Sequence, residues 1–259
     1  PASNIPGCGA IRLPQDGDCF YEAVHRAFAS AGRSAADDCG EPETMEGERP
    51  TRRLRRRVAR EVDGAVYDTF AMLHAAGLDD YAFMRRLPDA AALRVKLCVS
   101  GAESGATRCV WANEFEIATL CDVLELTALI VDEAAPEHSQ FVVIPGRDDR
   151  RRLQRRCYVV LLRTERAHYN LAAFDDRSLF EGLAQVPKHV RDTFGLPAAD
   201  RRAAPREPTV EPRLSEASEA TMGTRKAAVL PDPVWAQHMR SQPASASGTA
   251  YCWIGVGLR

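Results

Sequence analysis

Cys19 is the side chain best placed for covalent chemistry in this sequence, because it opens a segment that reads as a helix. In residues 19–30, CFYEAVHRAFAS, apolar side chains recur at the spacing of a buried helical face, and Cys19 falls in the first turn. A cysteine attacks as the thiolate, and its ordinary pKa of roughly 8.5 leaves little thiolate at neutral pH. The N–H groups and the dipole of a helix N-terminus lower that pKa, and an adjacent imidazole lowers it further. The position therefore predicts a nucleophilic thiol.

His168 is the histidine best suited to act as the general base toward that thiol. It begins HYNLAAF, residues 168–174, which reads as a strand, and Asn170 follows two residues later on the same face. His25 lies six residues after Cys19, about 240° around the same helix, and cannot turn back to the thiol. The other histidines lie at a helix end or in polar segments without an orienting partner: His74, His138, His189 and His238.

The turn before the helix, residues 16–19, could stabilise the negative oxygen of a tetrahedral intermediate. Gly17 lets the backbone N–H groups of this turn approach a substrate carbonyl, which a larger side chain would obstruct. Asp18 is next to Cys19 in the sequence, and its carboxylate would oppose formation of the thiolate if it pointed inward. We expect Asp18 to point to solvent.

The first half of the chain is predicted to be helical. Residues 33–50 are polar and contain Gly and Pro, which indicates a loop. One long helix is predicted next, because apolar residues recur from Leu54 to Leu73 and Gly77 follows as a stop. Its run RRLRRR, residues 52–57, is assigned to the solvated face, with a nuclear signal as the alternative. Short helical pieces are predicted over 79–98 and a loop over 100–109.

The second half of the chain is predicted to add one helix and a sheet. Asn113 can cap the helix, with Glu116 in the capping-box position. Strand-like runs follow at 127–132, 140–145 and 157–163, and 168–174 completes a set of four. Helices first and strands last predict an α+β fold, an α/β sandwich with a small central β-sheet packed between helices.

Composition limits the domain organisation and the environment of the protein. The 259 residues suit one main domain, at 1–195, and a flexible tail at 196–259 that ends in a short apolar segment. A net charge of −2 gives no overall attraction to nucleic acid or to acidic membranes. Without a long apolar run or the pattern of a secretion signal, we expect a protein that is neither membrane-bound nor secreted. The eight cysteines form no CxxC pair, which indicates reduced thiols in the cytoplasm.

Three short blocks of the sequence, in this order, resemble the ovarian-tumour (OTU) family of cysteine proteases. The segment PQDGDCFYEAV, around Cys19, is similar to the nucleophile motif of that family. WANEFEIATL, at 111–120, looks like the second family block, and HYNLAAF looks like the block that carries the catalytic histidine. Each block alone is a weak signal, and three in order are a strong one. The resemblance covers about residues 10–175.

The resemblance implies a papain-like OTU-type fold with Cys19 as nucleophile and His168 as base. Asn170 would orient the imidazole, with Asp16 as the competing residue, because some family members place the acid there. The backbone of Asp16 could instead join Gly17 and Cys19 in the oxyanion hole. The implied reaction is hydrolysis of the isopeptide or peptide bond after the C-terminal glycine of ubiquitin or a ubiquitin-like modifier, through a thioester on Cys19.

The resemblance also implies how the substrate is held. Trp111 would lie near the groove that receives the C-terminal tail of the modifier, flanking His168. Either Glu114 and Glu116 are carboxylates that only cap the helix or, as the alternative, one of them meets an arginine of that tail. The implied partners are conjugates of ubiquitin or of its relatives, without a metal, an organic cofactor, specific nucleic acid or membrane. We expect a monomer in the cytoplasm, which would be a host cytoplasm if the chain comes from a virus or another pathogen.

Three other functions stay open at this point. One is a catalytically silent ubiquitin-binding module of the same fold. Another is a viral cysteine protease that processes a polyprotein, a hypothesis that rests on a first residue, Pro1, that is not Met. The last is an RNA-binding scaffold that acts through RRLRRR and RDDRRRLQRR, but acidic residues or helical faces accompany these runs and no aromatic stacking residues do.

Overall fold

A computed structural model describes residues 5–133, 135, 140–144, 157–164 and 167–197 of the chain. The arginine-rich segment RDDRRRLQRR, two of the histidines set aside above (His138 and His238) and the tail from residue 198 onward lie outside the described residues. Within the described part of the chain, no helix combines the length and the hydrophobicity needed to cross a bilayer.

The helices precede most of the strands, as predicted. The helices are α1 (Cys19–Ser30), α2 (Ala35–Asp38), α3 (Pro50–Arg60), α4 (Gly64–Ala75), η2 (Asp79–Arg86), α5 (Ala90–Leu97), α6 (Gly101–Ser104), α7 (Glu114–Val123), η5 (Leu183–Gln185) and α8 (Lys188–Thr193). The strands are β1 (Cys8–Ile11), β2 (Leu126–Asp132), β3 (Phe141–Ile144), β4 (Cys157–Thr164), β5 (His168–Phe174) and β6 (Leu179–Phe180).

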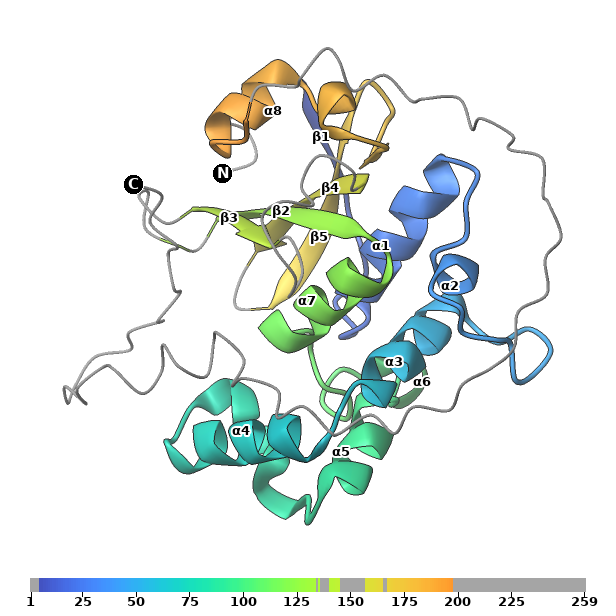
Figure 1. The fold of residues 1–259 in the computed structure, drawn as a ribbon, viewed down its shortest axis with the longest axis vertical. Helices are drawn as coiled ribbons and strands as arrows, with labels where there is room; N and C mark the ends of the chain where they lie inside the picture. Colours follow the sequence, from blue (N-terminus) through green and yellow to red (C-terminus); the bar gives the residue numbers. More distant parts are fainter. Residues whose placement is uncertain (1–4, 134, 136–139, 145–156, 165–166, 198–259) are drawn as a thin grey trace, which may run out of the picture. The chain divides into compact units, whose positions relative to one another are not determined.

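A mixed β-sheet forms the centre of the fold (Figure 1). The strand order is β1-β5-β4-β2-β3, and β6 pairs with the first half of β4. Strands β2 and β4 are parallel, and the other pairs are antiparallel. All seven residues of β2 are buried, as expected for a strand that is covered on both faces. The predicted α+β fold with a small central sheet is confirmed.

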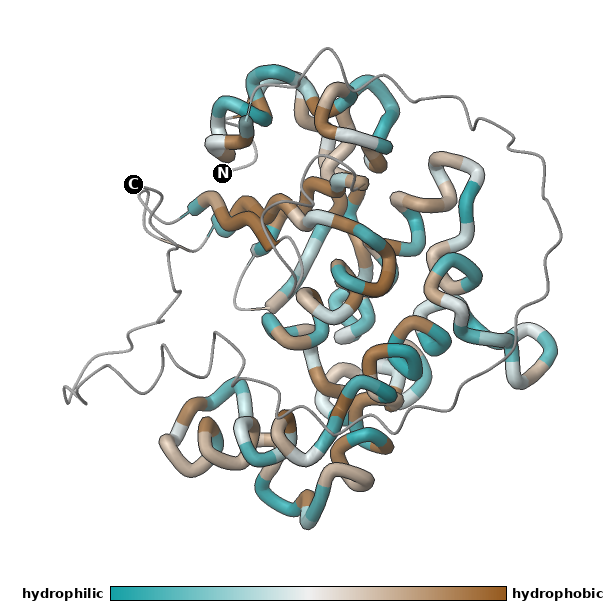
Figure 2. Tube along the Cα trace, in the orientation of Figure 1, coloured by the Kyte–Doolittle hydropathy of each residue, from teal (hydrophilic) through white to brown (hydrophobic). Residues whose placement is uncertain are grey.

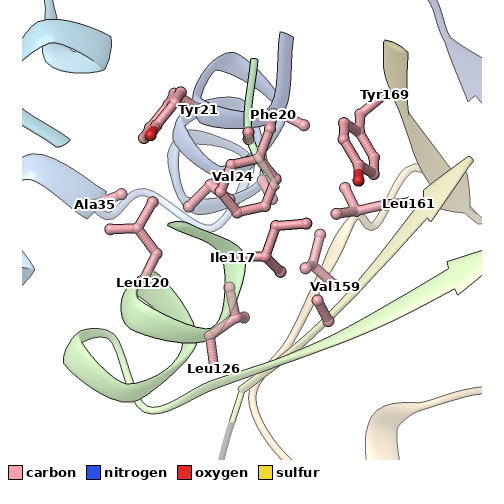
Figure 3. Packing of buried hydrophobic residues seen from close by; sticks show 14 of the residues in the cluster. Phe20, Tyr21, Val24, Ala35, Ile117, Leu120, Leu126, Val159, Leu161 and Tyr169 are labelled. Atoms are coloured by element: carbon pink, nitrogen blue, oxygen red, sulfur yellow. The ribbon is translucent and has the colours of Figure 1, made fainter. Parts of the chain in front are cut away.

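Alternate residues of the central strands face two separate hydrophobic cores. Ala128 and Val159 point to the core under α1 and α7, which Figure 3 shows from close by. Leu129 and Val160 point to the opposite core, which is covered by η5 and α8. The β2–β3 pair is accordingly coloured as mostly hydrophobic in Figure 2. The core under α1 and α7 positions the candidate site, because it contains both Cys19 and Tyr169.

The prediction of one long helix over residues 54–73 is wrong, because two helices, α3 and α4, cover this segment. The side chain of Asp63 accepts a hydrogen bond from the N–H of Val66 (2.9 Å) and so caps the start of α4. Val62, between the two helices, is buried, and the apolar spacing therefore continues across the break. The segments predicted as loops also contain the short helices α2 and α6, and β1, β6, η5 and α8 were not predicted.

The run RRLRRR of α3 lies on two sides of the helix. Arg55 is fully buried, so its assignment to the solvated face is wrong. Its neighbours in α3 pair with carboxylates: Arg52 with Glu48 and Glu103, Arg53 with Asp37, Arg56 with Glu41 and Glu48, Arg57 with Glu61, and Arg60 with Glu41. In the described structure, carboxylates therefore balance the positive charge of this run, which an RNA-binding or nuclear-signal role would require.

Candidate active site

The thiol of Cys19 lies against the start of strand β5. Cys19 is the first residue of α1, and 2% of its surface is exposed. Its Sγ accepts a hydrogen bond from the backbone N–H of Tyr169 (3.4 Å) and lies 3.8 Å from the carbonyl oxygen of Ala167. The rings of Phe20 and Tyr169 pack edge to face with their centroids 5.8 Å apart. The thiol therefore contacts the residues immediately before and after His168.

His168 is held in one orientation by Asn170. His168 is 4% exposed, and its Nε2 lies 3.2 Å from Oδ1 of Asn170. The same Oδ1 accepts a hydrogen bond from the backbone N–H of Leu13 (3.0 Å), which identifies this amide atom as the oxygen. Nε2 of His168 must then carry the proton, so in the neutral ring Nδ1 bears the free lone pair. Nδ1 is buried and has no hydrogen-bond partner among the described residues.

The thiol contacts the backbone on either side of His168 and forms no hydrogen bond with the imidazole in the described structure. Burial raises the pKa of the Cys19 thiol to about 11, and the charge of Asp16 adds to this effect. The backbone N–H groups of Tyr169 and Phe20 and the positive charge of Arg55 act in the opposite direction. The net effect of these surroundings is to raise the pKa of the thiol, which favours its neutral form.

Two peptide groups of the turn before α1 are oriented by their carbonyl oxygens. The carbonyl of Asp16 faces the thiol of Cys109 (3.6 Å), and the carbonyl of Asp18 accepts the N–H of Glu22 (2.9 Å). All described peptide bonds are trans, so the N–H groups that follow, those of Gly17 and Cys19, point the other way.

The N–H groups of Asp16, Gly17 and Cys19 have no acceptor among the described residues. The N–H of Asp18, in contrast, donates to Oδ1 of Asp16 (2.9 Å) and is already used. The turn can therefore offer backbone donors to a negative oxygen.

The two residues predicted to orient His168 have different surroundings. Asn170 contacts the ring directly, whereas the carboxylate of Asp16 holds the backbone N–H of Asp18. The structure thus brings Cys19, His168 and Asn170 together. The side chain of Asp16 instead accepts a hydrogen bond within the turn.

The prediction that Asp18 points to solvent is wrong. Asp18 is 2% exposed, and its carboxylate accepts hydrogen bonds from Arg55 Nε (2.6 Å), the hydroxyl of Ser100 (2.5 Å) and the N–H of Ala102 (3.1 Å). Burial alone would raise the pKa of Asp18, and Arg55 with these donors lowers it below its ordinary value. This contact could not be predicted from the sequence, because the partner arginine lies inside a basic run.

The residues predicted to bind substrate separate into two groups. Trp111 is half-buried and lies beside the turn, because a Cβ placed on Gly17 would be 3.5 Å from its Nε1. Glu114 is exposed at the first turn of α7. Glu116 is fully buried, its carboxylate accepts the N–H of Asn113 (3.0 Å), and burial raises its pKa to about 7. Glu116 is therefore a capping residue that no partner can reach.

Gly101 and Cys109 support the turn from behind, and the sequence did not single them out as site residues. A Cβ on Gly101 would lie 1.7 Å from the carbonyl oxygen of Asp16, and a Cβ on Gly17 would lie 2.2 Å from Sγ of Cys109. Both glycines are visible in the sequence, but only the fold brings their segments into contact.

We expect Gly17→Ala to destabilise the protein more than Gly77→Ala does. Both glycines have a positive φ (92° and 80°), which costs an alanine about 1 to 2 kcal/mol. Only Gly17 also meets a neighbour, Cys109, and such overpacking costs about 1 to 3 kcal/mol more. Urea unfolding of the two variants measures the difference, and Gly17→Ala combined with Cys109→Ala should recover part of it. Equal losses in the two single variants would contradict this packing.

We expect alkylation of Cys19 by iodoacetamide to rise about tenfold per pH unit between pH 7 and pH 10. The reason is that a thiol with a pKa of about 11 is almost fully protonated over this range, so thiolate increases in proportion to hydroxide. Mass spectrometry of the peptide that contains Cys19 measures the rate without interference from the other cysteines. A plateau near pH 7 would instead reveal a preformed thiolate–imidazolium pair.

No family model matches this sequence, and no curated protein matches it. The fold is similar to that of solved OTU domains at low sequence identity. An ovarian-tumour (OTU) domain in complex with ubiquitin is 13% identical, with 73% of this chain and 81% of that chain covered and a TM-score of 0.42. The Hazara virus OTU bound to ubiquitin is 17% identical (64% and 80% covered, TM-score 0.34). An OTU deubiquitinase from Wolbachia pipientis wMel is 12% identical (73% and 97% covered, TM-score 0.33).

Proposed function

We propose that this chain is a cysteine peptidase that hydrolyses the isopeptide or peptide bond after the C-terminal glycine of ubiquitin or a ubiquitin-like modifier. One observation carries the chemical part of the proposal. The thiol of Cys19 is bound by the backbone on both sides of His168, whose Nε2 is tied to Asn170 and whose Nδ1 is left unpaired. A nucleophile, a base and an orienting group are the parts that such a reaction needs.

The first half of the reaction would form a thioester. Sγ of Cys19 attacks the carbonyl carbon of the terminal glycine while its proton passes to Nδ1 of His168. The carbonyl oxygen becomes negative and is stabilised by the backbone N–H groups of the turn at Gly17 and Cys19. The C–N bond then breaks, and the leaving amine takes the proton from His168.

The second half would release the modifier. Water attacks the thioester and gives a proton to His168, which returns that proton to the sulfur as the C–S bond breaks. The products are the glycine carboxylic acid, which releases its proton to solvent and becomes the carboxylate, and the neutral thiol. Since the pKa of the resting thiol is raised, proton transfer to His168 would accompany the attack instead of preceding it.

The substrate class rests on the resemblance of the three sequence blocks to the OTU family. The surroundings of the turn are compatible with it, because Trp111 lies beside Gly17 and Glu114 is exposed nearby in the sequence. A substrate end made of two glycines suits a narrow passage that excludes larger side chains. In this proposal Trp111 would line that passage, and Glu114 would meet a basic residue of the tail.

A second candidate is a ubiquitin-binding module without turnover. One observation favours it: Cys19 and His168 do not share a hydrogen bond in the described structure. Catalytic hydrogen bonds often tighten only when substrate binds, and the alternatives therefore differ in reactivity more than in resting geometry.

We expect the native chain to form a covalent adduct with ubiquitin that carries a thiol-reactive C-terminal group. Cys19→Ala should abolish the adduct because the nucleophile is lost, and His168→Ala should slow it by about 100-fold or more because the base is lost. Gel shift and mass spectrometry measure the adduct. Cys8→Ala on β1 and His74→Ala on α4 are the matched controls and should keep the native rate.

A folded native chain that binds ubiquitin without forming the adduct would contradict hydrolysis and support the binding module. An adduct that persists in Cys19→Ala would show that another thiol reacts.

We expect Asn170→Ala to lower kcat far more than Asp16→Asn. Alanine leaves Nε2 of His168 without its acceptor, so the ring loses its tautomer and orientation. An amide orients the ring without a charge, so the loss should be roughly 100-fold, less than the roughly 10,000-fold typical of a triad aspartate. Asn at position 16 keeps an acceptor for the N–H of Asp18, and the loss should stay below about fivefold.

Steady-state hydrolysis of a fluorogenic ubiquitin substrate measures both variants. The reverse order of effects would assign the orienting role to Asp16.

A further inference from the structure

Arg55 is a buried arginine that the proposed reaction does not use, although it contacts the turn that carries the nucleophile. None of its surface is exposed. Nε donates to the carboxylate of Asp18 (2.6 Å), and Nη2 donates to the carbonyl oxygen of Gly17 (2.6 Å). Nη1 donates to the carbonyl oxygens of Val110 (3.0 Å) and Leu97 (3.3 Å). Helix α3 is thereby tied to the turn before α1 and to two further segments.

Burial of this charge is poorly explained by stability alone. Removing a guanidinium from water is costly, and well-packed apolar residues often replace a buried ion pair at no loss of stability. The guanidinium group also lies over the ring of Tyr21, 4.4 Å from its centroid, where a large apolar side chain could pack equally well. What an apolar side chain could not supply is the set of directed N–H donors.

Those donors fix the peptide group between Gly17 and Asp18 at both ends. Its carbonyl oxygen is held by Arg55, and its N–H is held by Oδ1 of Asp16. The second carboxylate oxygen of Asp18 is bound by Ser100 and Ala102, so the side chain cannot swing away. The free N–H groups of Gly17 and Cys19 belong to the peptide groups on either side of this immobilised one, whose fixed position limits how far they can turn.

Arg55 also sets the charge beneath the turn. Asp18 would place a negative charge next to the thiol and next to any oxyanion that forms there. The ion pair with Arg55 neutralises it. Geometry and charge thus act on the same step, the formation of the tetrahedral oxyanion.

We propose that Arg55 is a positioning residue, which holds the turn at residues 16–19 so that its N–H groups stabilise the oxyanion formed when Cys19 attacks a carbonyl. The inference rests on the proposed function for the identity of the nucleophile, and not for the identity of the substrate.

Two reactions of Cys19 in the full chain test this role without ubiquitin. Acetylation by p-nitrophenyl acetate passes through a tetrahedral oxyanion, which collapses to an acetyl thioester and p-nitrophenolate. Alkylation by iodoacetamide is a direct displacement of iodide and forms no oxyanion. Mass spectrometry of the peptide that contains Cys19 follows both reactions, with Cys19→Ala as the blank.

The variant is Arg55→Lys, which keeps the positive charge. Lysine lacks the planar guanidinium group that donates to Gly17 and Asp18 at the same time. We expect acetylation to slow by about 10- to 100-fold, because loss of one oxyanion donor typically costs about 100- to 1,000-fold and lysine keeps part of the support. Alkylation should change by less than about threefold. Arg56→Lys is the matched control, since Arg56 is the next residue of α3, pairs with Glu41 and Glu48, and should alter neither rate.

Equal slowing of both reactions in Arg55→Lys, or no change in either, would overturn the inference. Circular dichroism and thermal unfolding establish whether the variant folds. If it does not, Asp18→Asn replaces it, because this change removes the charge that pairs with Arg55 and the carboxylate oxygen that accepts from Ser100 and Ala102. Acetylation should then fall relative to alkylation, and an unchanged ratio would overturn the inference.

The outcomes also separate this inference from the proposed function. A native chain that is acetylated at Cys19 but never reacts with the ubiquitin probe would contradict the proposed substrate and leave the role of Arg55 standing. A native Cys19 that is alkylated but not acetylated would overturn the role of Arg55, whatever the ubiquitin probe does.

Discussion

The packing of the first turn of α1 against the start of β5 is the contact on which the candidate site depends. It joins a helix from the beginning of the described chain to a strand near its end, through the rings of Phe20 and Tyr169 and the hydrogen bond to the thiol of Cys19. Strand β5 is itself fixed between β1 and β4, and the core beneath it is closed by α7. A small displacement of α1 would separate sulfur and imidazole while leaving most of the fold intact.

The region behind the turn concentrates buried polar groups. Asp18 and Arg55 neutralise each other, while the carboxylate of Glu116 caps α7 with one of its oxygens and leaves the other without a hydrogen bond among the described residues. The hydroxyl of Tyr21 is also buried and has no hydrogen-bond partner among the described residues. Such groups are costly in a core, and here they lie around the segment that bears Cys19.

The sequence revealed what depends on local pattern and missed what depends on long-range contact. The helix after Cys19, the capping box of Asn113 and Glu116, and the four apolar strands all follow from spacing and cap chemistry. The break between α3 and α4 was missed because both helices keep the same apolar phase. Strand β1 was missed because its four residues gain their place only by pairing with β5. Arg55 was misassigned because periodicity cannot tell which arginine of a run finds a buried carboxylate.

The separation of the site along the chain has a consequence for biosynthesis. Cys19 emerges from a ribosome before Tyr169, its hydrogen-bond partner, which lies 150 residues later. At about 5 to 20 residues per second, roughly 8 to 30 seconds pass between the two events. During that time the nascent chain carries the thiol of Cys19 without the strand that covers it in the folded protein. The candidate site can therefore form only after β5 has been synthesised and has joined β1 and β4 in the sheet.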